Sequence, residues 1–298
     1  MENLWWLFAL CASIISAVFA YSNQIFKMNG LLFMVYRGFL VALITLPVIL
    51  MLPPIKEPFY YVFCILQGIC IAFNDHRFFR AVKAFGAEVA SIIQPISISF
   101  IFVFWLFFKP SQFQEYCQAP LTSVGIIACL IGITFSIIKI RNSKASGKAF
   151  FYLLPMLIIL SFGDIFNKKS MYYGQENLTS AIVYYAFITG MICGVSNLFV
   201  YIRKKKKIST IFKSKNLKHG AIISVIIIVS MAFKNLAMNY TQNPAYVSAI
   251  ILLSPIWIII GNNIYVKLKK AKTGYSHVKP WLAGLLLISV IGLVILNR

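Results

Sequence analysis

The chain is organised around one polar stretch, Asn74-Asp75-His76-Arg77-Phe78-Phe79-Arg80-Ala81-Val82-Lys83-Ala84-Phe85-Gly86-Ala87-Glu88, which lies between two hydrophobic runs. The run that follows it carries Gln94-Pro95. A second polar stretch, Lys234 to Pro244, comes much later and also precedes a hydrophobic run with a proline, Pro255. Because the same pattern occurs twice, we expect the chain to consist of two related halves.

The composition is that of a membrane protein. The chain has 298 residues, of which 60% are hydrophobic and only 12% are charged, whereas a soluble domain carries about 25% charged residues. A helix needs about 20 apolar residues to cross a bilayer. Runs of about this length lie at 4–24, 31–52, 59–78, 87–108, 121–139, 150–170, 178–202, 219–239, 244–266 and 280–297. The sequence therefore predicts an all-α membrane protein with ten transmembrane helices.

The net charge is strongly basic, with 28 Lys and Arg against 7 Asp and Glu. In a soluble protein this balance would suggest a nucleic-acid partner, but here most of the basic residues lie in the loops between the predicted helices. We therefore expect them to set the orientation and to contact anionic lipid head groups, and we expect no nucleic-acid partner. The cysteines and histidines have no metal-binding spacing, so no metal and no cofactor are expected.

The polar segment from Lys139 to Lys148 is the best candidate for a boundary between the halves. It leaves residues 1–140 and 150–298 with five predicted helices each. Because five is odd, the second half enters the membrane inverted relative to the first, and such inverted repeats let a central site open to alternate sides. Basic residues concentrate in the loops after the odd-numbered helices, so the positive-inside rule places both termini outside.

Several segments resemble the drug/metabolite transporter superfamily, specifically its ten-helix EamA-like members. Tyr36 to Leu40 looks like the family's arginine-phenylalanine opening of the second helix, and Ala81 to Ser91 looks like the segment that enters the fourth. Pro95 and Pro255 stand where each repeat tends to place a proline. The resemblance implies two inverted five-helix repeats and transport across the bacterial inner membrane. It also implies cytoplasmic termini, against the charge distribution, so the orientation stays open.

The chain departs from the family's pattern at several positions. The first helix has Ser16 to Phe19 in place of the family's tryptophan-glycine pair, Asn239 stands where the first half has Lys83, and Glu88 replaces a small apolar residue. Asp164 to Lys169 resembles a segment of the S-adenosylmethionine uptake branch. That resemblance makes S-adenosylmethionine the alternative substrate.

Polar and aromatic side chains inside or beside the hydrophobic helices form the candidate site, because ionisable groups are costly in a membrane and are functional by default. The candidates for substrate binding are Asn23, Arg37, Asp75, Glu88, Ser91, Gln94, Asp164, Lys168, Tyr185, Lys234, Asn235, Asn239 and Trp257. We expect no catalytic residue among them.

Several candidates have two interpretations. Asp164 either lines a cavity or is neutralised by Lys168, four residues later on the same helix face. Arg37 either contacts substrate or extends to the head groups. Lys234 has no acid beside it in the sequence, so it is expected to attract an anionic group of the solute.

The two remaining alternatives concern Asp75 and Trp257. Asp75 joins His76, Arg77 and Arg80 in a charge network at the mouth of the cavity, or these residues form a solvated helix end. Trp257 either stacks on a planar ligand or packs in the core.

These features predict a secondary carrier. A small organic solute, such as an amino acid or a nucleotide-like metabolite, would bind between the two halves, which rock to expose it to alternate sides. Transport would be driven by solute exchange or by protons that bind Asp164 and Glu88. The chain has no P-loop for ATP and no catalytic cluster, so it is not expected to be an enzyme. A lipid-modifying enzyme and a channel are the alternatives of another class. The small residues Ala128, Gly132 and Ser136 recur every fourth position, which indicates close helix packing or a homodimer.

Overall fold

The computed structural model describes residues 4–26, 29–85, 93–140, 147–206, 208–211, 213–269 and 280–296, and in these ranges every regular element is a helix. The α-helices are α1 (Trp5–Phe26), α2 (Gly30–Ile49), α3 (Pro58–Phe85), α5 (Ile93–Phe108), α6 (Pro110–Gln118), α7 (Pro120–Ile140), α8 (Gly147–Tyr173), α9 (Leu178–Arg203), α10 (Ser214–Tyr240), α11 (Pro244–Ile251), α12 (Ser254–Lys269) and α13 (Pro280–Leu296). Two short 3-10 helices, η2 (Gln175–Asn177) and η3 (Ile208–Thr210), lie in connections.

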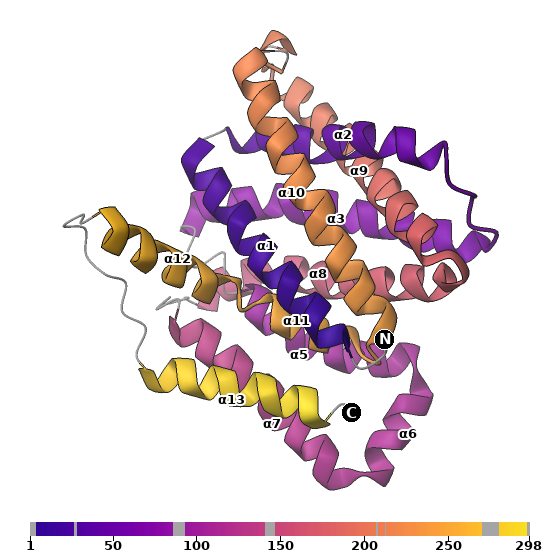
Figure 1. Cartoon of the computed structure of the whole chain (residues 1–298), viewed down its shortest axis with the longest axis vertical. Helices are drawn as coiled ribbons and strands as arrows, with labels where there is room; N and C mark the ends of the chain where they lie inside the picture. The colour runs from indigo at the N-terminus through magenta and orange to yellow at the C-terminus, as the bar shows by residue number, and fades with distance from the viewer. Residues whose placement is uncertain are drawn as a thin grey trace.

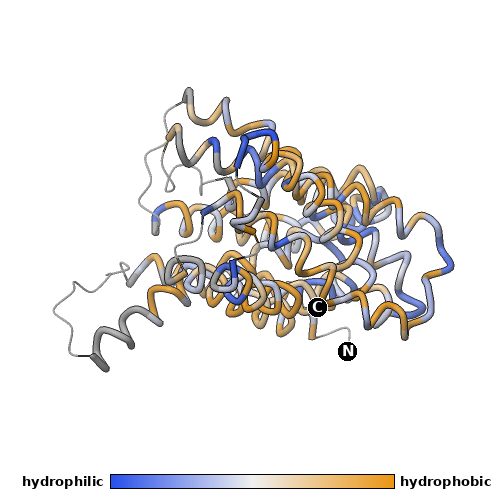
Figure 2. Tube along the Cα trace, turned by 90° about the horizontal axis from the view of Figure 1, so that it is seen from above, coloured by the Kyte–Doolittle hydropathy of each residue, from blue (hydrophilic) through white to orange (hydrophobic). Residues whose placement is uncertain are grey.

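The helices expose apolar side chains and bury polar ones. Leu121, Phe199 and Ile288 are among many large apolar residues on the outer surface, whereas Asn167 and Asn235 are buried. Figure 2 shows hydrophobic residues along most of each helix and hydrophilic residues gathered at several helix ends and connections. An apolar exterior of this extent suits lipid rather than water.

Eight helical segments among the described residues are long and apolar enough to cross a bilayer, so the chain is a multi-pass membrane protein. A ninth crossing results if α5 and α6, which meet at an angle of 105°, are taken as one bent span. The predicted run at 280–297 corresponds to α13, whose apolar part, Gly284–Leu296, is shorter than a crossing helix. The all-α membrane fold is thus confirmed. Of the ten predicted transmembrane helices, eight or nine are long enough among the described residues to cross a bilayer.

Four long helix pairs build the frame of the bundle. α2 packs along α9, α3 along α8, α1 along α10, and α7 along α13. Figure 1 shows α1 and α10 side by side across one face of the molecule, with α7 and α13 paired at its lower end. Each pair joins a helix that ends by residue 140 to one that begins at or after residue 147. The two predicted halves therefore interlock through all four pairs.

Glycine permits the close contact between α2 and α9. A Cβ atom added to Gly38 would lie 2.2 Å from the backbone of Gly194, and Gly190 lies against α2 one turn earlier. Gly190 and Gly194 form a GxxxG pattern, which lets helix backbones approach in lipid. The approach of these two helices fixes the neighbouring Arg37 of α2 and Cys193 of α9 inside the bundle.

The predicted single helix over 244–266 is broken between α11 and α12 at Leu252 and Leu253. Pro255 causes the break, because proline has no N–H and its ring clashes with the carbonyl four residues earlier. That carbonyl belongs to Ile251, and it accepts a hydrogen bond of 3.1 Å from Ser13 Oγ of α1. A neighbouring helix thus satisfies the backbone group that the proline frees.

The small-residue stripe of α7 packs within the chain at Gly132. A Cβ atom there would lie 2.4 Å from Ser289 Oγ of α13, and Gly292 of α13 in turn lies against Cys129. Ser136 is buried as well. The close-packing interpretation of the stripe is therefore confirmed at Gly132, and dimerisation stays a prediction.

Candidate functional site

A cavity of about 640 Å³ lies between α1, α2, α3, α8, α9, α10 and the junction of α11 and α12. Its lining residues recur at helical spacing, so each of the long helices α3, α8 and α10 contributes one stripe. The α3 stripe is Gln67, Cys70, Ile71, Asn74, Asp75 and Phe78; the α8 stripe is Met156, Leu160, Gly163, Asp164 and Asn167; the α10 stripe is Ile227, Ser230, Met231, Lys234 and Asn235. Arg37, Tyr185 and Ser254 are among the lining residues from other helices.

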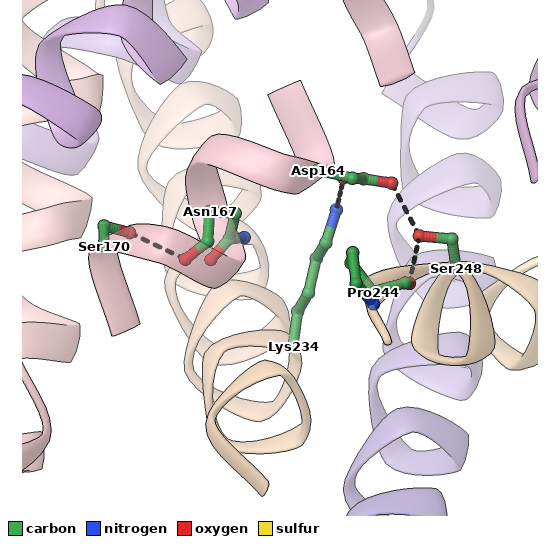
Figure 3. A network of polar contacts seen from close by, with 6 residues as sticks. All are labelled: Asp164, Asn167, Ser170, Lys234, Pro244 and Ser248. Carbon is green, nitrogen blue, oxygen red and sulfur yellow. Dashed lines mark hydrogen bonds and ion pairs between the residues drawn. The ribbon is translucent and has the colours of Figure 1, made fainter. Parts of the chain in front are cut away.

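One ion pair joins α8 to α10. Lys234 Nζ lies 2.6 Å from Asp164 Oδ1, and Ser248 Oγ of α11 donates to Asp164 Oδ2 at 2.6 Å. Figure 3 shows Lys234 and Ser248 approaching this carboxylate from different helices. Both carboxylate oxygens are therefore satisfied, and an acid inside a membrane protein is stabilised by such partners.

A second ion pair joins α2 to α3. Arg37 Nη1 lies 2.7 Å from Asp75 Oδ1, and the Cys193 thiol of α9 faces Asp75 Oδ2 at 3.6 Å. Arg37 thus points into the bundle toward Asp75 and lines the cavity. The interpretation in which Arg37 extends to the head groups is wrong, because the carboxylate of Asp75, on the cavity wall, binds its guanidinium.

The two ion pairs lie at different depths of the same cavity. A Cβ atom on Gly163 would lie 2.9 Å from Gln67 Oε1. Because Gly163 directly precedes Asp164, Gln67 of α3 lies at about the same depth as Asp164. Asp75 comes about two turns later on α3, which is about 12 Å along the axis at a rise of about 1.5 Å per residue. The cavity therefore extends between one charged pair and the other, and the four charges sum to zero.

Between and around these pairs stand four amide side chains. Gln67, Asn74, Asn167 and Asn235 all line the cavity and are at least nine-tenths buried. Among the residues that the structure describes, Gln67 Oε1, Asn74 Oδ1, Asn167 Oδ1 and both amide atoms of Asn235 have no hydrogen-bond partner in the protein. Buried polar atoms are almost always paired, so unpaired amide atoms at a cavity wall indicate that water or a solute completes their hydrogen bonds.

Of the two interpretations of Asp164, the one in which Lys168 neutralises it is wrong. Lys168 Nζ donates to the backbone carbonyls of Met238, at 2.7 Å, and Asn239, at 3.2 Å. These carbonyls lie in the last turn of α10, where the helix dipole favours a cation. Lys234 has no acid beside it in the sequence, but α10 packs against α8 and brings Lys234 to Asp164.

Of the remaining predicted site residues, some line the cavity and others lie away from it. Tyr185 lines the cavity, whereas Asn239 and Trp257 are not among its lining residues. Trp257 packs against the hydrophobic core, and its Nε1 donates to Ser13 Oγ at 3.1 Å. Glu88 and Ser91 lie outside the described residues, and so do the side chains of two further candidates, Asn23 in α1 and Gln94 in α5.

The polar stretch around Asp75 is divided in the structure. Asp75 pairs with Arg37 of another helix, while the guanidinium of Arg77 lies 5.3 Å from the ring centroid of Phe73 and 6.0 Å from that of Tyr152. Arg80 is exposed. The charge network predicted within this stretch is therefore replaced by one cavity-facing acid and basic residues that face elsewhere.

Sequence reasoning missed Gln67, Asn167 and Ser248 as site residues. A signal for Gln67 exists, because it is the single amide within the apolar run from Phe59 to Phe73 and stands two helical turns before Asn74. Ser248 carries no such signal, since a serine in an apolar helix usually bonds its own backbone. It bonds both the Pro244 carbonyl, at 3.1 Å, and Asp164.

No protein-family model matches the chain, and no curated protein is significantly similar to it, so a function for this cavity has to be argued from its geometry.

Proposed function

We propose that the chain is a secondary carrier of the bacterial inner membrane, which binds a small organic solute in the cavity and exposes it to alternate sides. The observation that carries this proposal is the cavity of about 640 Å³, walled by helices of both halves and holding two ion pairs. Its volume falls within the range of about 300–1,000 Å³ that is typical of small-molecule sites. Charged groups buried in a membrane are costly to keep, so they favour a site for a polar solute.

The helix packing supports two inverted repeats. Let α1, α2, α3, α5 and α7 correspond in order to α8, α9, α10, the α11–α12 unit and α13. Under this correspondence, the packing of α3 against α8 is matched by the packing of α10 against α1. The packing of α3 against α9 is matched by that of α10 against α2. The packing of α5 against α8 is matched by that of α11 and α12 against α1. The pairs α2 with α9 and α7 with α13 correspond to themselves. A two-fold relation between the halves, with ten helices in all, predicts this pattern.

The two ion pairs fit a rocking mechanism. Arg37 and Asp75 both belong to the first half, and Asp164 and Lys234 both belong to the second. Each pair can therefore stay intact while the halves move relative to one another, which avoids separating charges in a low-dielectric interior. Solute binding then has only to favour one arrangement of the halves over the other.

Transport by purified protein in liposomes tests the proposal. A thermal-shift screen against amino acids, nucleosides, nucleotides and S-adenosylmethionine first selects ligands, because a solute that binds the folded form raises its stability. We expect saturable uptake of a selected solute without ATP, accelerated when the same solute is present inside the liposomes. Asp164→Asn should slow the exchange, whereas Glu115→Gln, an exposed residue of α6, should not. Uptake that is linear in concentration, or that requires an ATPase, would contradict the carrier.

A further inference from the structure

The charged groups of the cavity are already occupied by one another. Lys234 and Ser248 donate to the two oxygens of Asp164, while Arg37 and the Cys193 thiol face the two oxygens of Asp75. A charged solute that displaced one of these partners would leave a buried charge unpaired, which is strongly destabilising. We therefore look for binding capacity that leaves both ion pairs intact.

That capacity lies in the amide face, which comprises Gln67, Asn74, Asn167 and Asn235. Among its amide atoms, four carbonyl oxygens and the nitrogen of Asn235 are buried and have no hydrogen-bond partner in the described part of the protein. The four residues come from three helices, α3, α8 and α10, and each sits on the stripe that faces the cavity. Figure 3 shows Asn167 close to Asp164 on α8, so the amide face adjoins the ion pair of Asp164 with Lys234.

We infer that the amide face is the recognition surface of the carrier and that its solute is uncharged and rich in hydrogen-bonding groups. This inference rests on the proposed function. Because each amide group both accepts and donates, the complementary edge of the solute does both. Since the four charges among the described lining residues cancel, an uncharged solute leaves this part of the cavity neutral. Polyols, nucleosides and carboxamides share this chemistry, and their common feature is several hydrogen-bonding groups without a net charge.

Protein stability distinguishes an amide that is retained for binding from one that is retained for folding. An amide kept for folding loses a hydrogen bond when it is replaced, and the protein is destabilised. An unpaired buried amide has no such bond to lose, so an apolar residue of similar shape is neutral or stabilising. Residues retained for binding at a cost in stability are typical of functional sites.

Asn235→Leu and Asn167→Leu test the inference in the full-length protein. We expect both variants to melt at the same temperature as the parent or higher when no solute is present. The matched control is Gln112→Met in α6, whose buried amide accepts from Trp105 Nε1 at 2.7 Å and donates to Tyr116 at 2.9 Å. That variant should melt at a lower temperature and bind solute as the parent does.

Binding is measured by thermal shift with myo-inositol, adenosine, uridine and nicotinamide, and with inositol phosphate and adenosine monophosphate as charged counterparts. At least one uncharged solute should stabilise the parent while its phosphate does not, and Asn235→Leu should weaken that binding at least tenfold. The inference is overturned if Asn235→Leu lowers the melting temperature as Gln112→Met does, or if only charged solutes bind. If charged solutes bind and exchange in liposomes, the carrier stands and the recognition surface is wrong; if no solute exchanges, the carrier itself fails.

Discussion

Lys234 of α10 holds Asp164 of α8 at 2.6 Å, although Lys168 stands one helical turn after Asp164 on the same helix. Spacing of four residues favours a pair on an isolated helix, where the gain is only about 0.2–0.5 kcal/mol. Inside the bundle each lysine instead takes the partner that packing brings to it. Lys168 reaches the end of α10, and Lys234 reaches the carboxylate that faces the cavity.

The Asp164–Lys234 pair should show strong energetic coupling. Lys234→Met removes one partner and leaves a carboxylate that is mostly buried, so we expect it to cost about 3 kcal/mol, the low end for buried pairs. Asp164→Asn in the same chain removes the stranded charge, and the double variant should recover part of the loss. Unfolding of the four proteins in detergent gives the coupling free energy, which we expect to exceed about 1 kcal/mol.

Glu115→Gln combined with Lys234→Met is the control cycle, because Glu115 is exposed on α6. Its coupling should be within about 0.5 kcal/mol of zero. Additive effects of Asp164→Asn and Lys234→Met would show that the observed ion pair contributes nothing to stability.

Proton coupling, if the carrier uses it, should depend on Asp164. A coupling group has to face the transport cavity and change its charge during the cycle. Asp164 lines the cavity, so it meets the first requirement. Asp164→Asn fixes the side chain in a neutral form. We expect it to abolish stimulation by an imposed pH gradient, with a fall of at least tenfold (about 1.4 kcal/mol) in gradient-driven accumulation, while solute exchange continues at a reduced rate.

Uptake into liposomes with and without an inside-alkaline gradient measures this effect. Glu88→Gln and Asp75→Asn are the parallel variants, since Glu88 is the other acid predicted to couple and Asp75 is the other cavity carboxylate. Full gradient sensitivity in Asp164→Asn would exclude Asp164 as the coupling group.

The sequence predicted the elements of this fold better than their partners. Hydrophobic runs locate the helices because crossing a bilayer requires length and apolarity, and these are local properties. Asp164 was recognised as a buried acid for the same reason. Its partner Lys234 lies 70 residues away along the chain, and only the packing of α8 on α10 makes the two adjacent. Pro255 stands in the sequence, yet the run at 244–266 was predicted as one helix, and Ser13, which satisfies the freed carbonyl, belongs to the first helix.

Gly38→Ala should disrupt the contact of α2 with α9. Its Cβ atom would stand 2.2 Å from the backbone of Gly194, and backbone cannot move aside as a flexible side chain can. Overpacking of this kind typically costs roughly 1–3 kcal/mol, and separation of the helices would also displace Arg37 from Asp75. The melting temperature should fall, and uptake should fall with it.

Gly284→Ala in α13 is the matched control, because nothing lies within 4 Å of the Cβ atom that it would add. Alanine is favoured over glycine in a helix by about 0.8–1.0 kcal/mol, so this variant should be as stable as the parent or more so. Equal stability of Gly38→Ala and Gly284→Ala would contradict the close approach.

Ser13→Ala should destabilise the junction of α11 and α12. Ser13 Oγ donates to the Ile251 carbonyl and accepts from Trp257 Nε1, so the substitution removes both bonds and leaves a partly buried carbonyl without its donor. Leaving buried polar groups unpaired costs about 1–3 kcal/mol. Unfolding in detergent measures the loss, and Ser99→Ala, an exposed serine of α5, should stay within about 0.5 kcal/mol of the parent.

The Pro255→Ala background shows which of the two bonds matters. Alanine at this position restores a backbone N–H four residues after Ile251, where a continuous helix would place the donor for that carbonyl. Ser13→Ala should therefore cost less in Pro255→Ala than in the parent, and the difference measures the bond to the carbonyl. If Ser13→Ala costs the same in both backgrounds, Ser13 stabilises the chain through Trp257 alone, and the proline break is satisfied in another way.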